Sequence, residues 1–411
     1  MVNQHKLSCS ELIVKKFGGT SVGSIERIEA VAEQIAHAYH NGEQQLIVLS
    51  AMAGETNRLL SLGAAINPHA NAREMDMLVA TGEQVSIALM AMALHKRGIA
   101  ARSLIAGQIK ITTDAHHGRA KIERIDTELL NELLAADIIP IVAGFQGVQQ
   151  GDITTLGRGG SDTTAVALAA VLNAKECQIY TDVAGVFTTD PNLEANAIKL
   201  AKISVDTMFE MARHGAKVLH PDSVDYARRY QVPLRVLSSF EQGSGTLIVP
   251  SSLVDESGQV VGMAVSRSQV VIHLTSVHNS EQVWDNITTE LNELGIETNL
   301  LTKSNTSTSS LSFTVDKSWL DAVLLKLETM TQQQKIAPVK YVDNQVRLSL
   351  ISNGLLNQVD VMSKAQGELN NIDVDVNLMS ASGAKVAMVF CESKLNVAIR
   401  TLHNAFQLNN Q

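Results

Sequence analysis

The sequence has few cysteines, and we expect no secretory signal, which argues against a disulfide-stabilised extracellular protein. Its three cysteines, Cys9, Cys177 and Cys391, are far apart in the 411-residue chain and are too few for a disulfide framework or a cysteine-based zinc site. The first residues, Met1–Glu11, are polar and contain no apolar stretch of the kind that a signal peptide needs. We therefore expect a cytoplasmic protein.

Long apolar runs and an excess of basic residues are also absent. The longest apolar stretches, such as Ile87–Leu94 and Ala165–Leu172, are far shorter than the roughly 20 residues that span a bilayer, so we expect no membrane segment. A net charge of −9 without a basic block argues against a nucleic acid partner. The composition, 45% hydrophobic and 18% charged, is typical of a globular protein, and the length suggests two or three domains.

From Leu12 to about Val249, short β-branched runs alternate with longer helical segments. This alternation predicts an α/β sheet covered by helices on both faces, in a first domain of residues 1–249. The predicted strands are Ile13–Lys16, Leu46–Ser50, Ile138–Ala143, Gln178–Asp182 and Pro233–Leu237, and the predicted helices are Ser24–His40, Glu83–Lys96 and Thr163–Ala174.

A linker is predicted at Pro250–Gly262, where Ser, Asp and Gly interrupt the pattern. After it, the order strand, helix, strand, strand, helix occurs twice. The first copy begins at Val270 and the second at Val346. Two such copies predict a pair of small ferredoxin-like βαββαβ modules, at residues 262–341 and 342–411.

A Walker-type phosphate loop is absent, because the pattern Gly-x-x-x-x-Gly-Lys-Ser/Thr does not occur. A different pair of glycines, Gly18 and Gly19, follows the first predicted strand and precedes a helix. Such glycines let backbone N–H groups approach an anion, and the helix N-terminus adds partial positive charge. Lys16 can bring its ammonium to the same phosphate oxygens. The alternative is a tight turn beside a surface lysine, and this segment alone does not separate the two.

Three more glycines surround Arg158 in the segment Gly157–Asp162, directly before the helix predicted at Thr163. A structural turn needs one glycine, whereas this segment combines a mobile backbone with a guanidinium, hydroxyls and a carboxylate. Arg158 is suited to a substrate carboxylate, and Asp162 to holding a lysine ammonium. We therefore favour a functional interpretation of this segment.

These two segments resemble the signatures of the aspartate kinases. Further segments resemble the same family, in family order: Ser50–Thr56, Arg73–Asp76, Thr81–Gln84, Gly144–Gly147, Thr181–Pro191 and Gly215–Pro221. The C-terminal repeat resembles the paired ACT modules of these enzymes. The resemblance implies an amino-acid-kinase-like α/β/α sandwich followed by two ACT-like modules.

The activity implied by the resemblance is transfer of the γ-phosphoryl group of ATP to the side-chain carboxylate of L-aspartate. The product is 4-phospho-L-aspartate, in the first step of lysine, threonine and methionine biosynthesis. Lys16 would stabilise the transferring group and Asp162 would orient Lys16. The implied aspartate contacts are Ser50, Thr56, Glu83, Phe145, Arg158 and Ser161. Glu83 would pair with the substrate ammonium and Arg158 would clamp a carboxylate, although a carboxylate at a helix N-terminus can also simply favour the helix dipole.

The resemblance also implies the nucleotide contacts, which are Lys16, Gly18, Gly19, Thr20, Thr181, Asp182, Phe187 and Lys217. Backbone donors of Gly18, Gly19, Gly159 and Gly160 would help to neutralise the transferring group. ATP would carry Mg²⁺ on its phosphates and water, so no protein metal ligands are expected. Two positions depart from the family: Phe187 replaces a common tyrosine, and Asn192 stands where a basic residue is frequent.

Two other functions remain as alternatives. One is another amino-acid kinase, for glutamate, acetylglutamate or uridylate. It is disfavoured by the ACT-like tail and by the segments Arg73–Asp76 and Thr81–Glu83. The other is a catalytically silent amino-acid sensor. This alternative is disfavoured because Lys16, Arg158 and Asp162 are intact. We expect a homodimer or larger homo-oligomer that assembles through the ACT-like region.

The ACT-like region departs from the family at three turns or strands. Val277–Ser280 replaces a Pro-Gly step, Lys303–Ser307 replaces a Gln-Asn pair followed by Ser, and Ser352–Gln358 retains one glycine. Effector contacts to backbone depend on such glycines, so we expect lysine or threonine to inhibit weakly or not at all. Alternatively the tail only dimerises and stabilises the enzyme.

Overall fold

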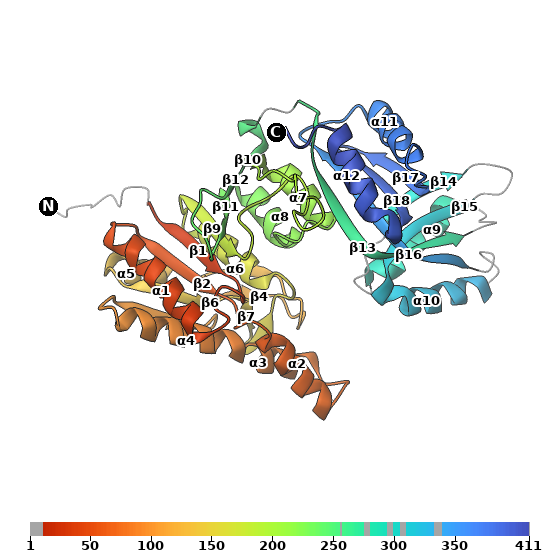
Figure 1. Cartoon of the computed structure of the whole chain (residues 1–411). Helices are drawn as coiled ribbons and strands as arrows, with labels where there is room; N and C mark the ends of the chain where they lie inside the picture. Colours follow the sequence, from red (N-terminus) through yellow and green to blue (C-terminus); the bar gives the residue numbers. More distant parts are fainter. Residues whose placement is uncertain are drawn as a thin grey trace. The chain divides into compact units, whose positions relative to one another are not determined.

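A computed structural model describes residues 11–254, 257–274, 280–293, 299–304, 310–332 and 339–410 (Figure 1). The chain divides into two compact units. Unit 1 comprises Met1–Val186, Lys199–Ala212 and Lys217–Val254, and unit 2 comprises Phe187–Ile198, Arg213–Ala216 and Asp255–Gln411.

Unit 1 is built on an eight-stranded sheet in the order β10-β12-β11-β9-β1-β2-β6-β3. Its strands are β1 (Ile13–Phe17), β2 (Gln45–Leu49), β3 (Ala101–Leu104), β6 (Ile139–Ala143), β9 (Glu176–Thr181), β10 (Lys202–Ser204), β11 (Leu234–Ser238) and β12 (Thr246–Val249). The run from β11 to β3 is parallel, and every residue of β1, β2 and β6 is buried. Central strands buried on both faces explain the continuous apolar runs of the sequence.

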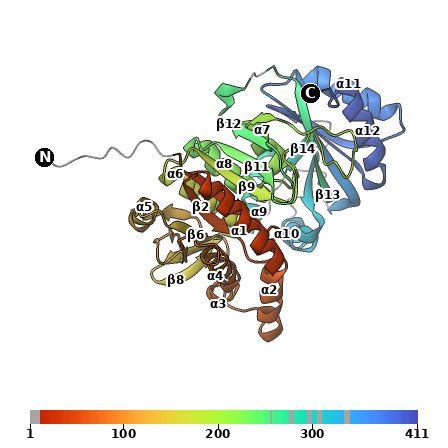
Figure 2. The same ribbon diagram turned by 60° about the vertical axis from the view of Figure 1, so that its left-hand side comes forward.

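Helices cover both faces of this sheet (Figures 1 and 2). Phe17 packs in one hydrophobic cluster with residues of α1 (Ile25–His40) and α4 (Thr81–His95). The neighbouring Lys16 points to the opposite face, where it meets Asp162 of α6 (Gly160–Val171). The other helices of unit 1 are α2 (Glu55–Ile66), α3 (Ala72–Val79), α5 (Glu128–Ala135), α7 (Val205–Arg213), α8 (Pro221–Tyr230) and the 3₁₀ turn η1 (Ser251–Leu253).

A second, smaller sheet in unit 1 was not predicted. Its order is β5-β4-β7-β8, with β4 (Thr112–Thr113), β5 (Ile122–Arg124), β7 (Gln146–Gln149) and β8 (Asp152–Thr155). The hairpin of β7 and β8 connects the end of β6 to the segment that precedes α6. It therefore delivers the glycine-rich segment around Arg158 to the main sheet.

Unit 2 contains one six-stranded sheet in the order β14-β15-β13-β16-β18-β17. Its elements are β13 (Val260–Leu274), α9 (Ser280–Glu293), β14 (Asn299–Ser304), β15 (Ser310–Asp316), η2 (Lys317–Trp319), α10 (Leu320–Gln332), β16 (Lys340–Ser352), α11 (Gln358–Asn370), β17 (Val376–Ser382), β18 (Lys385–Cys391), η3 (Glu392–Lys394) and α12 (Leu395–Ala405). The repeated order of strands and helices is the predicted one. All described strand pairs of this sheet are antiparallel.

The long strand β13 contributes to two hydrophobic cores. Val260 and Met263 pack with α11, α12 and β18, whereas Val270 and Ile272 pack with α9, α10 and β15. A strand of 15 residues is about three times the usual length, which allows one strand to serve both modules. The predicted linker at 250–262 accordingly ends in regular strand from Val260.

Two segments that come early in the chain belong to unit 2. In the segment 187–198, Thr188 Oγ1 lies 3.0 Å from His403 Nε2, and the Thr188 carbonyl accepts a hydrogen bond from the Met263 N–H at 2.7 Å. In the segment 213–216, His214 Nε2 lies 2.8 Å from Lys385 Nζ. Burial lowers the pKa of the His403 imidazole, which favours its neutral form. Unit 2 is therefore not continuous in sequence.

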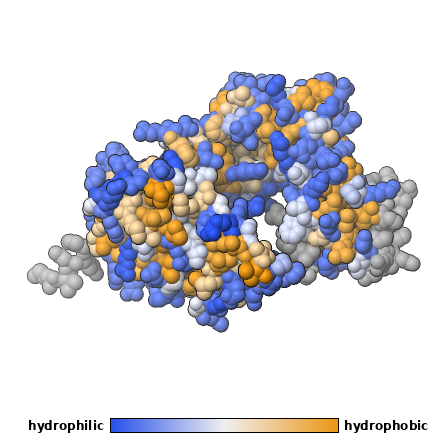
Figure 3. Space-filling view, turned by 60° about the horizontal axis from the view of Figure 1, so that its bottom comes forward, coloured by the Kyte–Doolittle hydropathy of each residue, from blue (hydrophilic) through white to orange (hydrophobic). Residues whose placement is uncertain are grey.

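One helical stretch, Ala72–His95, is long and apolar enough to cross a membrane by length and composition, and 56% of its most apolar window is buried inside the protein. Core helices of soluble domains pass the same test, so this stretch is weak evidence for a membrane span. On the face shown in Figure 3, hydrophobic side chains form separate patches among hydrophilic ones.

Candidate active site

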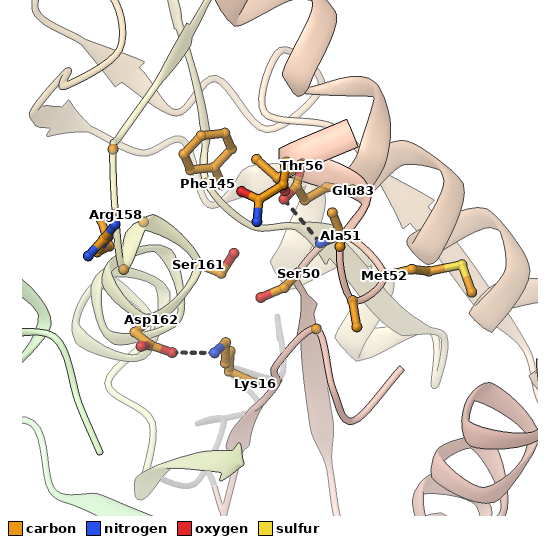
Figure 4. Close-up of a pocket in the computed structure, with 17 residues that line it drawn as sticks. Lys16, Ser50, Ala51, Met52, Thr56, Glu83, Phe145, Arg158, Ser161 and Asp162 are labelled. Atoms are coloured by element: carbon orange, nitrogen blue, oxygen red, sulfur yellow. Dashed lines mark hydrogen bonds and ion pairs between the residues drawn. The ribbon is translucent and has the colours of Figure 1, made fainter. Parts of the chain in front are cut away.

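A cavity of about 350 Å³ opens in unit 1 (Figure 4). Its lining residues come from the carboxyl ends of β1, β2 and β6, the N-terminal ends of α2 and α6, and α4. They are Lys16, Gly19, Ser50, Ala51, Met52, Ala53, Gly54, Thr56, Asn57, Glu83, Phe145, Gly157, Arg158, Gly159, Gly160, Ser161 and Asp162. The carboxyl edge of a parallel sheet is where α/β proteins usually bind ligands.

An ion pair between Lys16 and Asp162 lies at one end of this cavity (Figure 4). The Lys16 Nζ is 2.6 Å from Asp162 Oδ1, and both side chains are about nine-tenths buried. Asp162 lies in the first turn of α6, because this helix begins at Gly160, three residues before the predicted start at Thr163. The carboxylate therefore fixes a lysine ammonium beside a helix N-terminus, where negative charge is favoured.

The glycines around Arg158 have the backbone conformations that the segment needs. Gly157 and Gly159 have φ values of 75° and 74°, and a Cβ on Gly159 would lie 2.3 Å from the His220 side chain. Arg158 itself is exposed, and no hydrogen bond or ion pair of its guanidinium occurs within the described part of the chain. Its charge is thus available to a ligand in the cavity.

Two of the four glycine N–H groups predicted to face phosphate are already used by the protein. The Gly18 N–H donates to the Tyr180 carbonyl at 3.2 Å, and the Gly160 N–H donates to the Gly157 carbonyl at 3.1 Å. The predicted role of these two groups as phosphate donors stays a prediction, and a phosphate would compete there with these backbone hydrogen bonds. Gly19 and Gly159 make no such bond with any residue that the structure describes, and they remain candidates.

Glu83 carries a buried carboxylate at the other end of the cavity. Its Oε1 accepts a hydrogen bond from the Ala51 N–H at 3.0 Å, while Oε2 is buried without a hydrogen-bond partner among the described residues. Burial raises the pKa of Glu83 to about 7, and the bond from Ala51 opposes this rise. An unpaired buried carboxylate at a cavity wall is a suitable partner for a ligand ammonium.

The remaining residues predicted to contact aspartate also line the cavity. They are Ser50, after β2; Thr56, in the first turn of α2; Phe145, after β6; and Ser161, in the first turn of α6. Asn57 lines it as well and was missed, since the sequence pattern did not predict the helix α2 that places it there.

Of the predicted nucleotide residues, Lys16 and Gly19 line this cavity, and the other six do not. Thr181 and Asp182 follow β9, which is the neighbour of β1 on the side away from β2, and Thr181 Oγ1 donates to Asp182 Oδ1 at 2.9 Å. Thr20 and Gly18 flank Gly19 but do not line the cavity. Lys217 is exposed in unit 1, and Phe187 lies in unit 2. The carboxyl end of β1 thus lies between the cavity, on the β2 side, and Thr181 and Asp182, on the β9 side.

Comparisons with known proteins identify this arrangement. The amino acid kinase family matches residues 11–238. An aspartate kinase of Pseudomonas fluorescens (strain SBW25) is 43% identical over 404 residues, which are 97% of this chain and 98% of that protein. The chain belongs to the aspartate kinases of the amino acid kinase family. An aspartokinase of Geobacillus stearothermophilus is 42% identical over 400 residues, 97% of each chain.

Solved structures of aspartate kinases share the fold of the whole chain. The structure of E. coli aspartokinase III in complex with aspartate and ADP covers 96% of this chain and 99% of its own, with a TM-score of 0.80 and 26% identity. The predicted family, the fold class and the activity as an aspartate kinase, an ATP-binding phosphotransferase of amino-acid biosynthesis, are confirmed. The predicted residue roles stay predictions, and the turn residues 277–279 and 305–307 lie outside the described part of the chain.

Proposed function

We propose that L-aspartate binds in the cavity with its ammonium on Glu83 and a carboxylate on Arg158. The observation that supports this most directly is the pair of unused, opposite charges in one cavity: the Glu83 Oε2 and the Arg158 guanidinium. An amino acid presents one cation and, for aspartate, two carboxylates. Two partners of opposite charge select such a ligand over a simple dicarboxylate or amine.

In the proposed reaction, the second carboxylate of aspartate faces Lys16 and attacks the γ-phosphorus of ATP in line. A carboxylate is already nucleophilic, so the protein has to align it and to neutralise charge that spreads over the equatorial oxygens. Lys16 supplies a cation that Asp162 holds in place, and the N–H groups of Gly19 and Gly159 supply dipoles. The phosphoryl group passes to the aspartate oxygen as the bond to the β-phosphate oxygen of ADP breaks.

We place the nucleotide on the β9 side of Lys16, with Thr20, Thr181, Asp182 and Lys217 of unit 1 as its contacts; the predicted contact of Phe187, which belongs to unit 2, stays a prediction. The parallel register supports this side, because Phe17 pairs with Tyr180 and the chain continues directly to Thr181 at the same edge. Mg²⁺ enters with ATP in this proposal and adds charge neutralisation on the phosphates. No group of three His, Cys, Asp or Glu side chains able to hold a metal occurs in the described residues, so phosphate and water would supply most ligands.

The proposal also includes an oligomer that forms through unit 2, a cytoplasmic location, and release of 4-phospho-L-aspartate into the synthesis of lysine, threonine and methionine. The exposed apolar side chains of Leu355 and Val359, near the start of α11, support an interface on unit 2.

The experiment is a coupled assay of ADP release with L-aspartate, L-glutamate, succinate and no acceptor. We expect turnover with L-aspartate only. Arg158→Ala should raise the KM for aspartate strongly and leave the KM for ATP nearly unchanged. If the KM for ATP alone changes, Arg158 belongs to the nucleotide side and the proposed orientation of aspartate is wrong.

A further inference from the structure

Asp76 is a buried carboxylate outside the cavity that joins three segments of unit 1. It lies in α3 with 2% exposure and accepts hydrogen bonds from four donors. The donors are the His117 Nδ1 at 2.7 Å, the Gly118 N–H at 3.1 Å, the Thr155 N–H at 3.1 Å and the Thr155 hydroxyl at 2.5 Å. A carboxylate with this many partners is expensive to disturb, because each lost bond leaves a buried polar group unsatisfied.

Two of these bonds hold Thr155, three residues before Arg158 in the chain. Thr155 ends β8, and its carbonyl accepts from the Ala120 N–H at 2.9 Å, so every polar group of Thr155 is bonded. The Gly118 carbonyl lies 3.1 Å from the position that a Cβ on Gly157 would occupy. Asp76 therefore holds two neighbours of the segment before Arg158: Thr155, which is two residues before Gly157 in the chain, and Gly118, whose carbonyl lies close to Gly157.

Arg158 has no restraint of its own. Its guanidinium is unbonded within the described part of the chain, and glycines with positive φ flank it on both sides. Glycine has more freedom to lose than any other residue, so such a segment adopts one conformation only when its surroundings impose it.

We propose that Asp76 is a positioning residue for aspartate binding, which acts by holding the segment 155–158 so that Arg158 faces the cavity. The His117 imidazole and the Thr155 hydroxyl are its main side-chain partners. This inference rests on the proposed role of Arg158. Asp76 does not touch substrate, and its effect on the reaction passes through the Arg158 guanidinium.

The test compares Asp76→Asn with Arg73→Gln. Asparagine keeps the shape but replaces one acceptor oxygen by an NH₂ group that faces other donors. Arg73 is a matched control, since its Nη2 pairs with Asp152 Oδ1 at 2.6 Å and so joins the same helix to the far end of the same strand. We expect Asp76→Asn to raise the KM for aspartate by about tenfold, with the KM for ATP within about twofold, and Arg73→Gln to change neither.

A double-mutant cycle with Arg158→Ala separates positioning from general destabilisation. If Asp76 acts through Arg158, adding Asp76→Asn to Arg158→Ala should leave the KM for aspartate nearly unchanged. An equal rise in both backgrounds, or no rise in Asp76→Asn alone, would overturn the inference. If Arg158→Ala alone leaves the KM unchanged, the proposed role of Arg158 has failed instead.

Thr155→Val and His117→Ala serve if Asp76→Asn does not fold. Each removes one side-chain donor to the carboxylate, and each should raise the KM for aspartate by about threefold in the wild-type background but not with Arg158→Ala. Wild-type KM values for aspartate in both variants would overturn the inference.

Discussion

Glu83 makes aspartate binding depend on pH in a way that can be calculated from the structure. Burial raises the pKa of its carboxyl to about 7, because Oε2 has no partner among the described residues and the backbone hydrogen bonds, from Ala51 above all, do not compensate. Only the ionised form can pair with the substrate ammonium. Aspartate must therefore bind to the ionised fraction of the enzyme, which falls as pH falls below 7.

The magnitude follows from this fraction. About half of the enzyme is ionised at Glu83 at pH 7 and about one-tenth at pH 6, so the KM for aspartate should rise about tenfold from pH 8 to pH 6. Binding also releases a proton, since the ammonium draws Glu83 back to its ionised form. We expect about half a proton released at pH 7 and nearly one at pH 6.

The assay measures the KM for aspartate at saturating ATP from pH 6 to 8, together with calorimetry of aspartate binding in two buffers that differ in ionisation heat. Glu83→Gln should raise the KM at all pH values and remove its pH dependence. Glu55→Gln is the control, because the Glu55 carboxylate is on the nearby helix α2 but pairs with Arg58 at 2.7 Å. A KM that is flat in the wild type, or a slope that persists in Glu83→Gln, would refute the argument.

Three further outcomes are expected. Lys16→Ala should lower kcat by at least about a hundredfold with little change in the KM for aspartate, as measured by initial rates, because its charge is most useful as charge redistributes in the transition state. In thermal unfolding without ligand, the free energy of unfolding of the wild type should fall relative to that of Glu83→Gln by roughly 1–2 kcal/mol as pH rises from 5.5 to 7. The reason is that the Glu83 carboxyl has a raised pKa in the folded protein and so binds more protons there than in the unfolded chain over this pH range. Titration of lysine, threonine or both at low aspartate should give weak or no inhibition. At the turn before α11, the Ser352 hydroxyl already donates to the Gly354 carbonyl, and the Asn353 carbonyl already accepts from the Gly258 N–H. Inhibition by lysine or threonine at concentrations below millimolar would contradict this prediction.

The central strands and the two glycine segments could be predicted because their signals are local. Strands such as β1 and β6 are buried runs, and the order of elements in unit 2 follows from periodicity. The pairing of Lys16 with Asp162 was predicted from their chemistry and the resemblance together, and the structure places the two side chains 2.6 Å apart.

Other features depend on contacts between distant residues and left no local signal. In the sequence, Asp76 looks like an ordinary carboxylate on a helix. Its role depends on Thr155 and Gly118, which the fold of the small sheet brings to it. The hydrogen bond from the Gly18 N–H to the Tyr180 carbonyl was not predicted, because Tyr180 belongs to a strand more than 150 residues away. The division of β13 between two cores likewise appears only when both modules are folded.

Residues 187–198 and 213–216 belong to unit 2, and this limits how the enzyme can be truncated or how its domains can be exchanged. A polypeptide that stops at residue 249 would keep these segments but would lose Met263, Lys385 and His403, which bond to them. Phe187 begins the first segment, and Lys217 directly follows the second. The tail is thus a structural part of the kinase, and exchanging it between homologues would require that both early segments be exchanged with it.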